Sequence, residues 1–77
     1  MHKGFVLLNC DLGAEEFIVD ELKKISNVSQ AYITFGAYDI IAEINADSQE
    51  DLDGTVSLKI RRLTRVVSTM TLNVINS

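Results

Sequence analysis

The spacing of hydrophobic positions changes several times along this chain, and each change marks a predicted element. Residues 4–10 form a short apolar run, which is typical of a strand covered on both faces. The spacing then becomes helical, with a stripe formed by Ala14, Ile18, Leu22 and Ile25. Residues 28–35 and 38–44 follow as two strands. Because glycine adopts positive φ without steric cost, we expect Gly36 at the corner of a tight β-hairpin between them.

The second half of the chain repeats this order. Ser48 is a favourable N-cap, and Asp51 three residues later resembles the acid of a capping box. A second helical stripe follows, consisting of Leu52, Val56, Ile60 and Leu63. Residues 66–75 form the last predicted strand. One constant offset pairs five apolar positions of the two halves: Ala14 with Leu52, Ile18 with Val56, Leu22 with Ile60, Ile25 with Leu63 and Val28 with Val66.

This doubled β-α-β pattern predicts an α+β protein with the order β-α-β-β-α-β. Right-handed crossovers would interleave the halves into one four-stranded antiparallel sheet with two helices on one face, the ferredoxin-like arrangement. We predict that the helix-facing positions of the third and fourth strands are Ile40, Ala42, Ile44, Met70, Leu72 and Val74. The other face is mixed in polarity, as in a surface buried against another subunit, and this predicts a homodimer with its sheets face to face.

Composition favours one small folded domain over residues 1–77, with 47% hydrophobic and 23% charged residues. Domains of this size without disulfides or metals usually gain stability by association. The single cysteine, Cys10, excludes an internal disulfide, and the single histidine, His2, leaves no zinc cluster. We therefore predict no metal and no cofactor.

The net charge of −4 argues against direct DNA binding, since nucleic-acid binders usually carry a basic excess. The one basic cluster is interpreted as a helix C-terminus, where cations complement the helix dipole; it consists of Lys59, Arg61, Arg62 and Arg65. No apolar run approaches the length that spans a membrane, and no signal peptide is recognised. These features predict a cytoplasmic protein without membrane association.

The chain resembles the effector-binding domain of the Lrp/AsnC transcription regulators, often called the RAM domain, over nearly its whole length. The resemblance is carried by FVLLN at residues 5–9, the helix at 15–25 followed by Val28, FGAYDI at 35–40 and VVSTMTL at 66–72. Its sharpest piece is Gly-Ala-Tyr-Asp at residues 36–39, set at the central hairpin.

The resemblance implies a dimeric α+β barrel that builds larger rings and binds amino-acid effectors between subunits. The residues that it places near the effector are Gly36, Ala37, Tyr38, Asp39, Ser68, Thr69 and Thr71. Asp39 would accept from the ammonium group, while hydroxyls and backbone N–H groups would bind the carboxylate. The family's DNA-binding domain has no counterpart in these residues, which implies a stand-alone sensory module with a full-length regulator as a candidate partner. Position 37, often acidic in the family, is alanine here.

Other interpretations stay open from the residues themselves. Asp39 needs a partner inside an apolar strand, either a backbone N–H or a ligand. Tyr38 also suits a subunit contact, and Thr69 and Thr71 are ordinary strand residues. The alternative functions are a purely structural assembly module and, ranked last, a small dimeric α+β-barrel enzyme. No acid–base pair supports the enzyme, so no catalytic residue is predicted.

Overall fold

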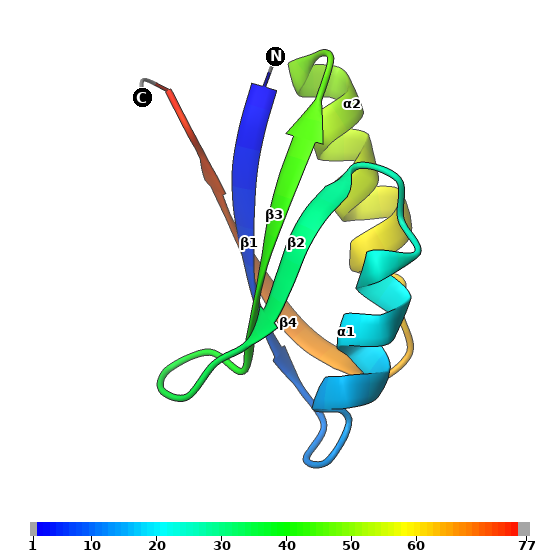
Figure 1. Ribbon diagram of the computed structural model, residues 1–77, viewed down its shortest axis with the longest axis vertical. Coiled ribbons are helices and arrows are strands. Elements are labelled where there is room, and N and C mark those ends of the chain that lie inside the picture. The colour runs from blue at the N-terminus through cyan, green and yellow to red at the C-terminus, as the bar shows by residue number, and fades with distance from the viewer. Residues whose placement is uncertain (1, 76–77) are drawn as a thin grey trace.

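A computed structural model describes residues 2–75 of the chain (Figure 1). Its elements in order are β1 (His2–Cys10), α1 (Glu15–Lys23), β2 (Val28–Ile33), β3 (Ile40–Ala46), α2 (Gln49–Gly54), the π-helix η1 (Thr55–Ile60) and β4 (Val66–Asn73). The order β-α-β-β-α-β predicted from the sequence is confirmed, with η1 continuing the second helix.

The four strands form one antiparallel sheet in the order β2-β3-β1-β4, which leaves β2 and β4 at its edges. Both helices lie on the same face of this sheet, and the opposite face has no cover from the described residues (Figure 1). This is the predicted ferredoxin-like fold. No helix within residues 2–75 is long and apolar enough to cross a membrane.

The hydrophobic core fills the layer between the helices and the sheet. The apolar stripes predicted for the two helices are confirmed, because Ala14, Ile18, Leu22, Leu52 and Ile60 are completely buried and Val56 is nearly so. Val19 joins the core as well, whereas Phe17 beside the first stripe stays half-exposed. Ile40, Ala42 and Ile44 of β3 face this core as predicted and are also completely buried.

The second helix starts as predicted but does not keep one geometry. Ser48 is its N-cap, and the Ser48 hydroxyl accepts a hydrogen bond from the Asp51 N–H at 3.1 Å. After Gly54 the α-helix widens into η1, where the Arg61 N–H bonds to the Val56 carbonyl, five residues back. At Thr55, the first residue of η1, the side-chain hydroxyl donates a hydrogen bond to the carbonyl of Asp51 at 2.9 Å.

The connection between β2 and β3 is longer than the predicted tight hairpin and comprises residues 34–39. Gly36 has a φ of +147°, so the expected positive φ is confirmed. The strands end early because Thr34 closes the loop: its N–H bonds to the Asp39 carbonyl at 2.8 Å, and its hydroxyl donates to the Tyr38 carbonyl at 2.7 Å.

The predicted helix-facing side of β4 is wrong, because the alternation of its side chains is shifted by one residue. β4 pairs with β1 so that Thr71 lies opposite Val6 and Thr69 opposite Leu8, both buried under the helices. Directly paired residues share a face, so Thr69 and Thr71 point to the helix side. The side chains of Met70 and Leu72 therefore lie on the uncovered face, where they are 48% and 52% exposed. The register continues past β4, where the Val74 N–H bonds to the Lys3 carbonyl, and places Val74 on that face too.

The uncovered sheet face is consequently more apolar than the sequence pattern indicated. We call it the open face and define its apolar part by the residues that alternate away from the helices: Phe5, Leu7, Tyr32, Ile41, Met70 and Leu72. Polar groups lie around this centre. Among them Ser29 donates to the Glu43 carboxylate at 2.9 Å, and Lys3 lies 3.6 Å from the same carboxylate.

Candidate functional site

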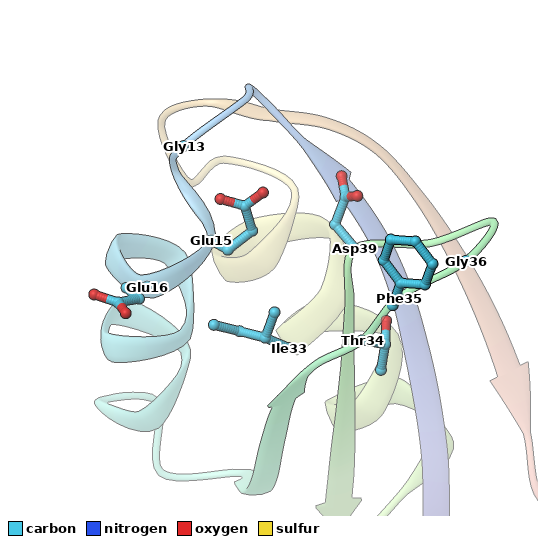
Figure 2. Close-up of a pocket in the computed structure, with 8 residues that line it drawn as sticks. All are labelled: Gly13, Glu15, Glu16, Ile33, Thr34, Phe35, Gly36 and Asp39. Atoms are coloured by element: carbon cyan, nitrogen blue, oxygen red, sulfur yellow. The ribbon is translucent and has the colours of Figure 1, made fainter.

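A pocket of about 650 Å³ lies at one end of the sheet. The residues that line it come from the turn after β1, the start of α1, the end of β2 and the β2–β3 loop (Figure 2). Its lining consists of Gly13, Glu15, Glu16, Ile33, Thr34, Phe35, Gly36 and Asp39. We call it the acidic pocket, because three of these residues carry carboxylates and none carries a positive charge. Two of the predicted site residues, Gly36 and Asp39, therefore contribute to one concave site.

The acidic side chains come from two elements. Glu15 lies in the first turn of α1, and Asp39 immediately precedes β3. Figure 2 shows these two carboxylates on either side of the pocket with Ile33 below them, while Glu16 extends to the outer side of the helix. Such a site combines an apolar floor with negative charge, an environment that favours a cationic or ammonium group over an anion.

Asp39 has a structural partner inside the protein. One oxygen of its carboxylate accepts a hydrogen bond from the Cys10 N–H at 2.9 Å, and the Asp39 N–H donates to the Leu8 carbonyl at 2.9 Å. The sequence left open whether the partner of Asp39 is a backbone N–H or a ligand, and the structure shows a backbone N–H. These bonds attach the β2–β3 loop to the end of β1 and fix one wall of the acidic pocket.

The Asp39 carboxylate also changes the pKa of the neighbouring Cys10 thiol. Burial raises the pKa of the Cys10 thiol above its ordinary value, and the nearby Asp39 carboxylate raises the pKa further. This direction disfavours the thiolate, which is the nucleophilic form of the side chain.

A contact that the sequence did not predict joins the turn after β1 to the segment before β4, and we call it the Asp11–Arg65 clasp. The Asp11 N–H bonds to the Arg65 carbonyl at 2.9 Å, and the Arg65 guanidinium lies 3.5 Å from the Asp11 carboxylate. Arg65 adopts a φ of +76°, which is unusual for a residue other than glycine. The positive charge on Arg65 and an acid after β1 were visible in the sequence, but no local signal pairs residues so far apart.

The remaining predicted site residues lie elsewhere. Ser68 and Thr69 line a second pocket, at the start of β4, together with Arg61, Val66 and Val67. The Tyr38 hydroxyl donates to the sulfur of Met70 at 3.4 Å, which directs it toward the open face. Ala37 is exposed in the loop, and Thr71 faces the helix side opposite Val6. Within one chain, the seven predicted site residues therefore lie on different surfaces and do not form a single site.

No group of three or more metal-ligating side chains gathers within residues 2–75. The geometry instead defines a ferredoxin-like α+β module with an uncovered apolar sheet face and an acidic pocket at one end. A sequence model of the Lrp/AsnC ligand binding domain matches residues 3–77. The chain therefore belongs to the Lrp/AsnC ligand binding domain family.

Solved structures agree with this assignment. The chain is 31% identical to FFRP-DM1, with a TM-score of 0.93, and the match covers 97% of this chain and 100% of that one. Escherichia coli AsnC is 23% identical with a TM-score of 0.92; the match covers 99% of this chain and 52% of AsnC.

The Neisseria meningitidis transcriptional regulator NMB0573, solved as a complex with L-Met, is 13% identical with a TM-score of 0.87, covering 97% and 50% of the two chains. At such low identities, the likeness to AsnC and NMB0573 shows the fold. A comparison with curated protein sequences gave no match.

Replacing Asp39 with alanine should lower the free energy of unfolding by about 1–3 kcal/mol, because the Cys10 N–H loses its partner in a half-buried place. Asparagine keeps an acceptor oxygen, so Asp39→Asn should cost clearly less. The measurement is urea unfolding at a fixed protein concentration, with Asp47→Ala at an exposed acid as the control. Equal stabilities for Asp39→Ala and Asp47→Ala would show that the bond contributes nothing.

Proposed function

We propose that this chain is a ligand-sensing and oligomerisation module that binds an amino acid or a similar small molecule at subunit interfaces. The observation that carries the proposal is the open face. Six large side chains with apolar bodies lie side by side on it, and three of them, Tyr32, Met70 and Leu72, are about half exposed. A contiguous apolar patch with a polar rim is typical of a surface that another subunit covers.

A second copy of the chain fits this surface. A two-fold partner would present the same residues to the open face, as in a homodimer whose sheets pack face to face and form a dimeric α+β barrel. We further propose that such dimers join into a larger ring. The small size of the chain supports association, since 77 residues give a limited core and Cys10 forms no disulfide.

The acidic pocket supports the ligand-binding part. An amino acid carries an ammonium group, which Asp39 and Glu15 would attract, and Ile33 would contact an apolar side chain. NMB0573, a regulator with this fold, was solved with L-Met. We propose Gly36, Ala37, Tyr38 and Asp39 as the loop that approaches the ligand. The hydroxyls of Ser68, Thr69 and Thr71 would come from a neighbouring subunit, since in one chain Ser68 and Thr69 line a different pocket.

We infer that the module is regulatory rather than enzymatic and acts in the cytoplasm as one domain over residues 1–77. Its partner would be a full-length Lrp/AsnC regulator that carries the same domain, and the module itself would not bind DNA. The family description as a ligand binding domain supports a regulatory role. The raised pKa of the Cys10 thiol also argues against nucleophilic chemistry at this loop.

The second candidate is a purely structural assembly module. One observation favours it: the Asp39 carboxylate already has a backbone partner in the Cys10 N–H. In this case the hydrogen bond of Asp39 only stabilises the conformation of the loop at residues 34–39, and the acidic pocket binds no ligand.

Replacing Leu72 with glutamate should dissociate the assembly, weakening association by at least about tenfold, because an unpaired carboxylate would be buried in the contact. The matched control is Leu58→Glu, which makes the same change at a similarly exposed leucine on the helical layer. Light scattering after gel filtration measures the mass. If both variants keep the mass of the unaltered protein, the open face is not the contact.

A thermal-shift screen against the amino acids tests ligand binding. A ligand that prefers the folded assembly stabilises it by about 2.7 kcal/mol at 100 times its Kd, so the unfolding midpoint should rise. Glu15→Gln should reduce that rise, because it removes one pocket charge, whereas Asp20→Asn on the exposed side of α1 should not. A screen without any shift would favour the structural module.

A further inference from the structure

A groove of about 480 Å³ lies on the helical layer, along α2 and η1, which Figure 1 shows as one continuous helical rod. We call it the α2 groove; its lining residues are Asn27, Glu50, Asp51, Gly54, Thr55, Leu58 and Lys59. We propose that it is a contact surface for the same helical rod of a second copy of the chain, through which dimers join. The proposal rests on the proposed dimer for its building block but not on ligand binding.

Gly54 indicates that something approaches this helix closely. Glycine inside a helix is less favourable than alanine, so it usually meets a local need, either an unusual φ or a crowded neighbour. Neither applies at Gly54. Its φ of −63° is ordinary for a helix, and a Cβ added to it would meet no described atom within 4 Å beyond its own helix and chain neighbours. The bare backbone at this position is therefore available to a partner from outside the chain.

Gly54 lies in the middle of an outward stripe of the rod. Glu50, Gly54 and Leu58 follow one another at intervals of four residues, which keeps them on one side of a helix that widens after Gly54. All three line the α2 groove, and Leu58 is 62% exposed. Another side of the rod faces β4, where Gln49 donates to Asn73 at 3.3 Å. The stripe thus offers a small centre beside a large apolar side chain, which suits the packing of a second helix.

The charges of the rod are divided between its two ends. Glu50 and Asp51 lie in the first turn of α2, Lys59 lies in the last turn of η1, and Arg62 follows; all four are exposed. Within residues 2–75 none of these four side chains forms an ion pair. An antiparallel copy would place the acids of each rod beside the cations of the other, and a two-fold axis near Gly54 gives both contacts at once. This charge complementarity is the reason for choosing a second copy as the occupant.

The contact is short, which suits a contact between dimers. Residues 49–60 form a rod at most about 18 Å long, so a single contact of this kind would be weak. In a closed assembly the contact is repeated, and each repeat strengthens the others because the subunits are already held together. The open face and the α2 groove would then alternate around the assembly as two different two-fold contacts.

Charge reversal tests the contact, with light scattering after gel filtration as the measurement on the full chain. The unaltered protein should form a species larger than the dimer. Two double variants make the rod wholly basic or wholly acidic: Glu50→Lys with Asp51→Lys, and Lys59→Glu with Arg62→Glu. Each should keep the dimer and weaken the association of dimers by at least about tenfold, because like charges then face each other. Lys23→Glu, at an exposed lysine of α1, is the control and should not change the mass.

Mixing the two double variants separates a specific contact from damage to the fold. The equimolar mixture should restore the larger species, since each rod then meets one of opposite charge. Gly54→Leu, which fills the groove without changing the charge, is a second probe should a double variant fail to fold. It should also remove the larger species, whereas Ser57→Leu, an exposed position of η1 that does not line the groove, should keep it.

The two contacts of the assembly are distinguished by two leucines. Leu72→Glu should remove the dimer, whereas Leu58→Glu should keep the dimer and lose only the larger species. A dimer that survives Leu72→Glu therefore contradicts the open face and not the α2 groove. The proposal for the α2 groove is overturned if the unaltered protein forms nothing larger than a dimer, if the folded double variants or Gly54→Leu associate as the unaltered chain does, or if the mixture stays dimeric.

Discussion

The architecture depends on burying one side of a single sheet. Two helical segments of a 77-residue chain cover only one face of four strands, and the completely buried side chains, from Val6 in β1 to Ile60 in η1, belong to that one layer. The other face then has large apolar side chains that nothing in the described chain covers, among them Phe5, Ile41 and Met70. The hydrophobic effect acts on this face as strongly per unit area as on the core, which is why we propose that a second layer comes from outside the chain.

The polar contacts that connect the loops are concentrated at one end of the sheet. The hydrogen bond from the Cys10 N–H to Asp39 and the Asp11–Arg65 clasp tie three connections to the same end of β1. Around this end the chain separates its charges, with carboxylates at the acidic pocket and Arg61 at the pocket of β4. An assembly that brings one pocket of a subunit near the other of its neighbour would offer both charges that a zwitterion needs.

Much of the fold could be predicted because its signals are local. Helical stripes such as Ile18 with Leu22, the Ser48 cap and the positive φ of Gly36 each follow from a few neighbouring residues. The helix-facing side of β4 could not be predicted, because both alternating sets of residues in that strand mix apolar and hydroxyl side chains. Only the pairing with β1 decides that Thr69 lies on the helix side. The same limit applies to the site. Gly36 and Asp39 belong to a short motif, whereas the contact between Asp11 and Arg65 joins residues far apart in the sequence and has no local signal.

We propose that a second copy of this chain covers the open face. Sedimentation velocity of the unaltered protein, diluted from high to low micromolar concentration, measures it directly, with circular dichroism on the same samples to report folding. We expect every folded species to have at least the mass of a dimer, and the circular dichroism of the folded state to be lost together with association. A compact, fully folded monomer that persists at low micromolar concentration would contradict it.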